Sequence, residues 1–186
     1  MVTLASLWLP ILVSAVFVFL ASWLVHMFLP FHRSDFSRLP QEDAVLDALR
    51  SLNVPSGHYV APYASSPEQM KQPEYQEKRK RGPALLLHLE AGSVPGMGKS
   101  LAQWFIYLLV ISAFVAYLAR HGIPAGAHYP EVFKFVAVAA FMAYALGHAH
   151  QSIWWRQAWR TTVNYGIDGL IYALLTAGVF GWLWPH

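Results

Sequence analysis

Asp168 is an acidic side chain inside an otherwise apolar run of residues, Tyr165–Trp184. An ionisable group in such a run is costly to place in lipid, which makes it a functional candidate. His26 and His148 lie at the ends of two other apolar runs. Two imidazoles and one carboxylate form a ligand set for a divalent metal ion. We therefore regard His26, His148 and Asp168 as candidate metal ligands.

The spacing of the histidines limits such a site. His148 and His150 are two residues apart, so on one α-helix their side chains point about 200° apart and only one can join Asp168. Three protein ligands would leave a metal ion with an open position, as in catalytic zinc sites. Two histidines from different helices could instead bind a haem. The structural alternative for Asp168 is an ion pair with Arg160 or Arg156.

Other motifs that carry chemistry are absent from the sequence. The stretch Ser93–Ser100 ends like a phosphate-binding loop, but Ser93 stands where that pattern requires glycine, so no nucleotide is expected. The basic run Lys78–Arg81 lacks a recognition fold for nucleic acid. The chain has no cysteine and no set of nucleophile, base and orienting group. These absences favour a non-enzymatic function.

The composition indicates the environment of these residues. Of the 186 residues, 56% are hydrophobic and only 12% are charged, whereas a soluble domain carries about 25% charged residues. Four windows are long and apolar enough to cross about 30 Å of hydrocarbon as helices. They are Leu7–Leu29, Leu101–Ala119, Val132–His150 and Tyr165–Trp184. The sequence predicts an all-α integral membrane protein with four transmembrane helices.

The placement of basic residues predicts the orientation in the membrane. Eleven of the thirteen lysines and arginines fall in residues 30–100 or in the loop 151–164. Loops rich in Lys and Arg stay in the cytoplasm. We therefore expect residues 30–100 in the cytoplasm and both chain ends outside, in a bacterial inner membrane.

The segment between the first two spans predicts a small α+β insert. Its expected parts are a short helix from Pro40 to Leu52, strands at His58–Ala61 and Ala84–Leu89, and a mobile basic loop at Ser65–Arg81. The predicted organisation is therefore a first transmembrane helix in residues 1–29, the insert in residues 30–100, and a three-helix membrane region in residues 101–186.

Small residues recur every four positions in the last two spans. Such stripes let helix backbones approach closely in lipid. We interpret them as the seam of a hairpin between these spans, with homodimerisation as the competing use. The stripe in the third span is Ala139, Ala143 and Gly147, and the stripe in the fourth is Gly169, Ala173, Ala177 and Gly181.

Aromatic and basic residues near the predicted span ends indicate contact with membrane lipids. Indole rings favour the interface because one edge can bond to water while the ring stays in lipid. Trp155 and Trp159 are expected to share one helical face, and Arg156 and Arg160 another. The predicted interfacial residues are Trp154, Trp155, Arg156, Trp159, Arg160 and Lys99.

These patterns favour an accessory, assembly or scaffold subunit that packs against another membrane protein or a second copy of itself. The alternative is a small metal- or haem-dependent membrane enzyme, or a small transporter, centred on Asp168 and the nearby histidines. The leading hypothesis needs no cofactor. The alternative would use a bound metal ion or haem.

Overall fold

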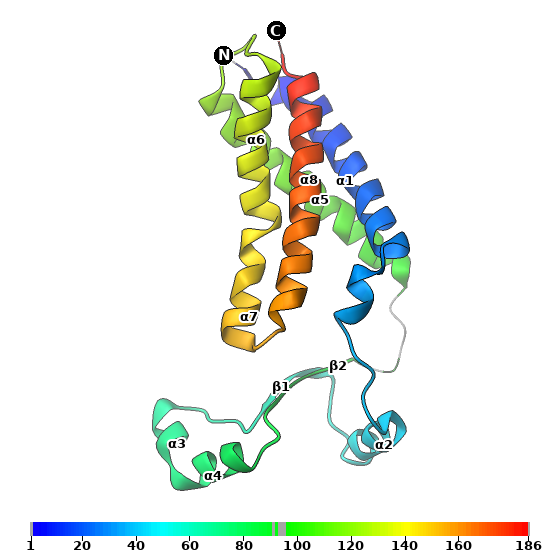
Figure 1. Ribbon diagram of the computed structural model, residues 1–186, viewed down its shortest axis with the longest axis vertical. Helices are drawn as coiled ribbons and strands as arrows, with labels where there is room; N and C mark the ends of the chain where they lie inside the picture. Colours follow the sequence, from blue (N-terminus) through cyan, green and yellow to red (C-terminus); the bar gives the residue numbers. More distant parts are fainter. Residues whose placement is uncertain (1, 91, 93–95, 186) are drawn as a thin grey trace. The chain divides into compact units, whose positions relative to one another are not determined.

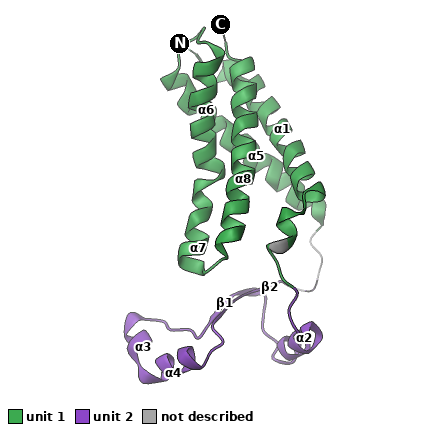
Figure 2. Ribbon diagram, in the orientation of Figure 1, with its two compact units in different colours: residues 1–37, 95–186 green, residues 38–94 purple. Residues whose placement is uncertain are grey.

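The protein is mostly helical, as predicted. A computed structural model describes residues 2–90, 92 and 96–185, and Figure 1 labels its helices and strands. The chain divides into two compact units, Met1–Ser37 with Pro95–His186 and Arg38–Val94 (Figure 2). The first unit contains the long helices, and the second contains a two-stranded sheet with short helices. Each unit is described by itself.

The four predicted spans are helical in the structure. Four stretches are long and apolar enough to cross a membrane: Ala5–Phe28, Met97–Gly122, Tyr129–Trp155 and Trp159–Trp182. Their elements are η1 (Ala5–Leu7), α1 (Trp8–Phe28), α5 (Met97–Gly122), α6 (Tyr129–Tyr144), η3 (Leu146–His148), α7 (Ala149–Trp155) and α8 (Trp159–Trp182). The third stretch is therefore interrupted by a short 3-10 turn.

Helices α6 and α8 pack side by side as a hairpin (Figure 1). The small-residue stripe of α8 is buried at Ala173 and Ala177, and at Gly181 it meets the ring of Tyr129 of α6. A Cβ atom at Gly169 would lie 2.7 Å from the Cβ of Ala145, closer than van der Waals contact permits. Glycine at position 169 therefore allows the backbone of Ala145 to approach α8.

The buried face of α6 differs from the stripe proposed for it. Ala143 and Gly147 are exposed and Ala139 is only partly buried. The fully buried residues of α6 are Val132, Val136, Ala140 and Tyr144. One partner of a close helix pair has to be small, and the glycines and alanines of α8 fill that role. Larger side chains of α6 then pack into the grooves that α8 provides.

Two hydrogen bonds to backbone carbonyls hold one end of the helical unit together. The Trp184 indole N–H donates to the carbonyl of Pro124 (2.9 Å), and the Gly126 N–H donates to the carbonyl of Pro185 (2.9 Å). These bonds join the end of α8 to the loop between α5 and α6. Helix α1 begins at this same end, whereas α7 lies at the opposite end (Figure 1).

The second unit contains the predicted two-stranded sheet. Strands β1 (Gly57–Ala61) and β2 (Leu85–Leu89) pair antiparallel. In this register His58 lies opposite His88, and Val60 lies opposite Leu86. Helix α2 (Glu42–Ser51) precedes β1 and has no buried residue.

Two short helices replace the mobile loop that was predicted between the strands. They are α3 (Pro67–Lys71) and α4 (Pro73–Arg81). The Ser66 hydroxyl accepts a bond from the Gln69 N–H (3.3 Å) and caps α3. Pro67 and Pro73 occupy first-turn positions, where proline is favoured. These local signals outweigh the polar composition that suggested a loop.

Candidate metal centre

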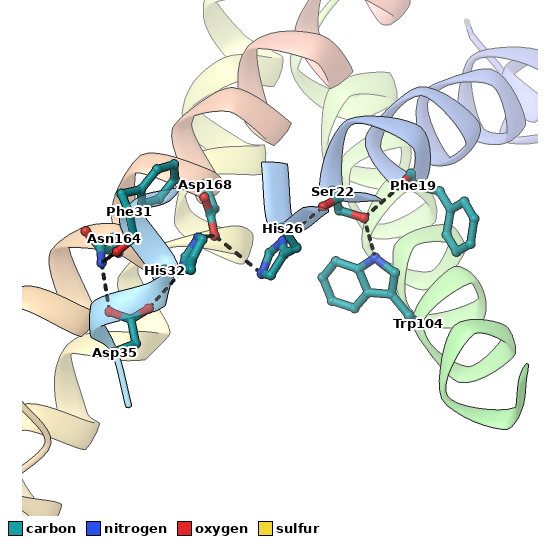
Figure 3. Close-up of polar contacts among 9 residues, drawn as sticks. All are labelled: Phe19, Ser22, His26, Phe31, His32, Asp35, Trp104, Asn164 and Asp168. Atoms are coloured by element: carbon teal, nitrogen blue, oxygen red, sulfur yellow. Dashed lines mark hydrogen bonds and ion pairs between the residues drawn. The ribbon is translucent and has the colours of Figure 1, made fainter. Parts of the chain in front are cut away.

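The end of α1 brings two histidines back towards α8. His26 lies in the last turn of α1, and Leu29 is extended because a residue before proline avoids the helical conformation. Pro30 then begins η2 (Pro30–Ser34), a short 3-10 turn that contains His32. Figure 3 shows both imidazoles beside Asp168 of α8. All of these elements belong to the helical unit.

Three possible metal ligands converge there. The His32 Nε2 atom lies 2.9 Å from Asp168 Oδ2, and His26 Nε2 lies 4.0 Å from the same oxygen. The three ligand atoms all lie within 4.8 Å of one another. The Asp168 and His32 side chains are 5% and 13% exposed, whereas that of His26 is 50% exposed. The centre is therefore closed on the α8 side and open beside His26.

Each imidazole is oriented through its other ring nitrogen. His26 Nδ1 donates to the Ser22 carbonyl (2.9 Å). His32 Nδ1 donates to Asp35 Oδ2 (2.7 Å), and the Asn164 amide donates to Asp35 Oδ1 (2.8 Å). With Nδ1 as the donor, the tautomer places the Nε2 lone pair of each ring towards Asp168. Metal-binding histidines are commonly held in this way by a carboxylate or a carbonyl.

In the metal-free centre with both imidazoles neutral, the atoms that face one another are all hydrogen-bond acceptors and no proton lies between them. Two neutral imidazoles would present only lone pairs to the Asp168 carboxylate, and acceptors repel one another at these distances. Among the described residues, Asp168 Oδ1 is buried without a hydrogen-bond partner. A buried carboxylate is stable only when it is paired or bound to a cation. Either a metal ion or a proton on His32 can supply the missing positive charge.

The contacts of His32 and Asp35 shift the pKa values of both side chains. Burial of the His32 imidazole disfavours its charged form, but the hydrogen bond to Asp35 and the nearby Asp168 carboxylate outweigh burial and raise the pKa of His32. Burial likewise disfavours the charged form of Asp35, but hydrogen bonds from His32 and Asn164 prevail and lower the pKa of Asp35.

The structure brings together only two of the three residues proposed as ligands. His26 and Asp168 meet, but His148 lies in η3 and packs against the ring of Tyr165, with 4.9 Å between ring centroids. His150 bonds to the carbonyl of Gly147. The 3-10 turn that interrupts the third stretch therefore leaves both of these histidines outside the centre.

His32 and Asp35 are the residues that the sequence analysis missed. Residues 30–37 belong to the helical unit, although the prediction placed them in the insert. The available signals were the His32–Asp35 spacing of three residues and the Leu29-Pro30 pair, which ends a helix. Their proximity to Asp168 could not be seen without the helix packing.

The contacts of Asp168 and the stacking of the two imidazoles bear on two alternatives that the sequence left open. Asp168 pairs with His32 and His26 instead of with Arg156 or Arg160, both of which are exposed. The rings of His26 and His32 are stacked, with 4.6 Å between centroids and 9° between planes. Axial histidines of a haem lie on opposite faces of the macrocycle, and the two rings are not arranged in that way.

The predicted interfacial residues are exposed, but they do not form one helix. Helix α7 ends at Trp155, Arg156 has a left-handed backbone (φ 61°), and α8 begins at Trp159. Trp155 and Trp159 therefore lie on different helices and share no helical face. Trp154, Trp155, Trp159, Arg156 and Arg160 are all exposed, as is Lys99 in the first turn of α5.

A buried polar stripe continues along α8 from the centre. It consists of Asn164, Asp168, Tyr172 and Thr176, which are four residues apart and all buried. In the part of the chain that the structure describes, the Tyr172 hydroxyl is buried without a hydrogen-bond partner. The stripe gives the interior of the helical unit a polar line that runs from Asn164 through Asp168 to Thr176.

Comparisons with known proteins find no matching family model, curated protein or solved structure. Residues 93–95 of the stretch that ends like a phosphate-binding loop lie outside the described residues. Function is therefore argued from the geometry of the chain alone.

Proposed function

We propose that this chain is a multi-pass protein of a bacterial inner membrane. Its four long apolar helices support that proposal, as do the large apolar side chains that they expose, such as Trp8, Phe114 and Trp182. Eleven of thirteen basic residues lie in segments that the positive-inside rule assigns to the cytoplasm. In this orientation the candidate metal centre lies at the cytoplasmic end of α1 and α8.

The function that we propose for the centre is binding of a divalent transition-metal ion, with Zn²⁺ as the reference ion. The observation that carries this proposal is the convergence of two oriented imidazoles on one buried carboxylate. Two nitrogens and one oxygen suit Zn²⁺ and the neighbouring transition metals. Three protein ligands leave a position for water or a substrate, and half-exposed His26 lies on the open side.

Metal analysis of the full chain tests this function. The protein is purified in mild detergent without a polyhistidine tag, loaded with Zn²⁺ and dialysed against metal-free buffer. All chains in this test carry His58→Gln, which removes the exposed imidazole pair of β1 and β2. In this background we expect one retained ion per chain, lost when Asp168→Asn or His32→Gln is added. The matched control is His121→Gln, because His121 also lies in the last turn of a long helix and bonds to the carbonyl four residues earlier.

Retention of Zn²⁺ by Asp168→Asn and His32→Gln would reject the metal centre. No retained ion in the chain with His58→Gln alone would also reject it and would leave His32, protonated between Asp35 and Asp168, as the source of positive charge. The first result would indicate an ion bound elsewhere in the chain, and the second would indicate a purely structural ion pair.

A second candidate function is docking of a partner protein, and helix α2 favours it. Its apolar side chains Val45, Leu46 and Leu52 are exposed, while acidic residues occupy its first turn. The acidic residues of the first turn disfavour an anionic lipid surface as the cover for this stripe. A partner helix with a complementary apolar face fits it better, in keeping with an accessory or scaffold subunit.

Co-purification in mild detergent tests the docking function. We expect Leu46→Ser with Leu52→Ser to release a stoichiometric partner, identified by mass spectrometry, and deletion of residues 41–90 to do the same. Asp47→Ser is the matched control on the polar face of α2. Retention of the same partner by the double variant would place the docking surface elsewhere, and identical subunits in the complex would indicate self-association.

A further inference from the structure

The two-stranded sheet of the second unit carries a pair of histidines that the candidate metal centre does not use. His58 of β1 and His88 of β2 are direct cross-strand partners. Their Nδ1 atoms lie 3.2 Å apart, and the rings are perpendicular, with 4.0 Å between centroids. Both residues are exposed, so solvent ions can reach them.

The separation of these nitrogens fits two ligands of one metal ion. With metal–nitrogen bonds of about 2.0–2.1 Å, two imidazole nitrogens on a tetrahedral ion lie about 3.3 Å apart. The observed separation is 3.2 Å, close to that value. If both Nδ1 lone pairs pointed at one ion, the ring centroids would lie about 5 Å apart instead of the observed 4.0 Å, so the rings must rotate when an ion binds. The strand register, not a flexible loop, places the two residues opposite one another, so binding needs rotation of the side chains and no movement of the strands.

A carboxylate lies beside the other nitrogen of one ring. Glu90 Oε1 is 3.8 Å from His88 Nε2. When Nδ1 binds a metal ion, Nε2 carries the proton, and a nearby carboxylate stabilises that tautomer and makes the ligand more basic. His88 therefore has both a candidate metal-facing nitrogen and a candidate outer partner.

We propose that His58 and His88 form a second, solvent-exposed site for a divalent transition-metal ion, with water completing its coordination. The site is independent of the centre at Asp168, since the two share no residue. An ion held between β1 and β2 would join the two ends of the segment that connects these strands and contains α3 and α4. A two-stranded ribbon is marginally stable by itself, so bound metal stabilises the pairing of these strands.

The test measures Zn²⁺ binding to the full chain by competition with a chromophoric chelator. The Asp168→Asn background removes the other centre, and no polyhistidine tag is present. We expect one ion of moderate affinity in this background. His58→Gln and His88→Gln should each weaken binding at least about tenfold, and Glu90→Gln, which leaves both proposed ligands in place, roughly tenfold. His121→Gln, an exposed histidine on α5, serves as the control.

A second measurement keeps the proposal testable if Asp168→Asn does not fold. Hydrogen exchange of the β1 and β2 amides in the otherwise unchanged chain should slow when Zn²⁺ is added, and this slowing should vanish in His58→Gln. Equal Zn²⁺ affinity in His58→Gln, His88→Gln and His121→Gln would overturn the proposal. The short nitrogen–nitrogen contact would then be a hydrogen bond between two imidazoles.

Discussion

His32 Nε2 lies 2.9 Å from Asp168 Oδ2, although the two residues come from opposite ends of the chain. The contact fastens η2, the turn that follows α1, to the first half of α8. Asp35 holds the same imidazole from the other side, through Nδ1. His32 is therefore fixed between two carboxylates, one of which is itself bonded to Asn164 of α8.

Asp35→Asn should weaken Zn²⁺ binding without removing a ligand. The substitution replaces the carboxylate that orients His32 with a neutral amide. Loss of such an outer partner typically lowers metal affinity about 10–100-fold. Chelator competition measures the change, and Asp43→Asn on exposed α2 is the control. Affinity equal to that of the unchanged chain would show that Asp35 does not position His32 for a metal ion.

The metal-free protein should lose stability as pH rises through the folded-state pKa of His32. That pKa is raised above the ordinary value of 6.5, so its contribution is complete below 6.5 and disappears at higher pH. Asp35 has a lowered pKa, so its contribution is present above its ordinary value of 3.8 and disappears as the pH falls. Thermal unfolding in a chelator should therefore show greatest stability between these values.

Metal affinity should follow the opposite trend, because Zn²⁺ competes with a proton for His32. Binding should strengthen from pH 6 to pH 8 while the metal-free protein becomes less stable. His32→Gln should flatten the pH dependence of stability over this range. A metal-free stability that rises with pH in the unchanged chain would contradict the placement of a protonated His32 between two carboxylates.

Gly169→Ala should destabilise the α6–α8 hairpin. The new methyl group would lie 2.7 Å from Ala145 Cβ and 3.0 Å from its Cα, and the Ala145 backbone cannot rotate away as a side chain could. Overpacking of this kind costs about 1–3 kcal/mol. Gly166→Ala is the matched control on the same helix, since it meets no atom within 4 Å. Equal thermal stability of the two variants would contradict the close approach.

Tyr172→Phe should leave thermal stability unchanged or raise it slightly. The hydroxyl that it removes is buried and has no partner among the described residues, so its desolvation is uncompensated. Ser112→Ala is the contrasting variant, because Ser112 accepts a bond from the Ser14 hydroxyl (3.1 Å), and it should destabilise by about 1 kcal/mol. A large loss in Tyr172→Phe would indicate bound water or a ligand on the buried polar stripe.

Reporter fusions should place position 66 and the C-terminus in opposite compartments. The physical reason is the concentration of basic residues in residues 30–100 and 151–164. A reporter active only in the cytoplasm should be active at Ser66 and inactive at the C-terminus, with a reporter active only outside as the reciprocal control. Activity of one reporter at both positions would reject this topology.

The long helices could be found from the sequence because their signal is local. Runs of apolar residues of sufficient length predict a helix wherever they occur, and the structure has helices at all four. The strands of the second unit were likewise recognisable from short apolar runs. The α3–α4 region was predicted as a loop because its composition is polar, whereas a serine cap and two prolines determine its helices.

The small-residue pattern of α8 also identified the side on which it meets α6, but the same pattern in α6 did not mark its buried face. A stripe of small residues states only that a close approach is possible. Which helix supplies the small residues and which the large depends on how two surfaces fit.

The sequence by itself determined that Asp168 is an unusual acidic group in an apolar helix and that His26 is one of its possible partners. Only the tertiary structure decided that His32 is the nearest partner and that His148 is not. The reason is that α1 ends before Pro30, which begins the 3-10 turn that contains His32, and that a second 3-10 turn contains His148. Each turn determines where the histidine that it contains points. Whether that side chain meets Asp168, which is distant in the sequence, cannot be read from residue spacing along the chain.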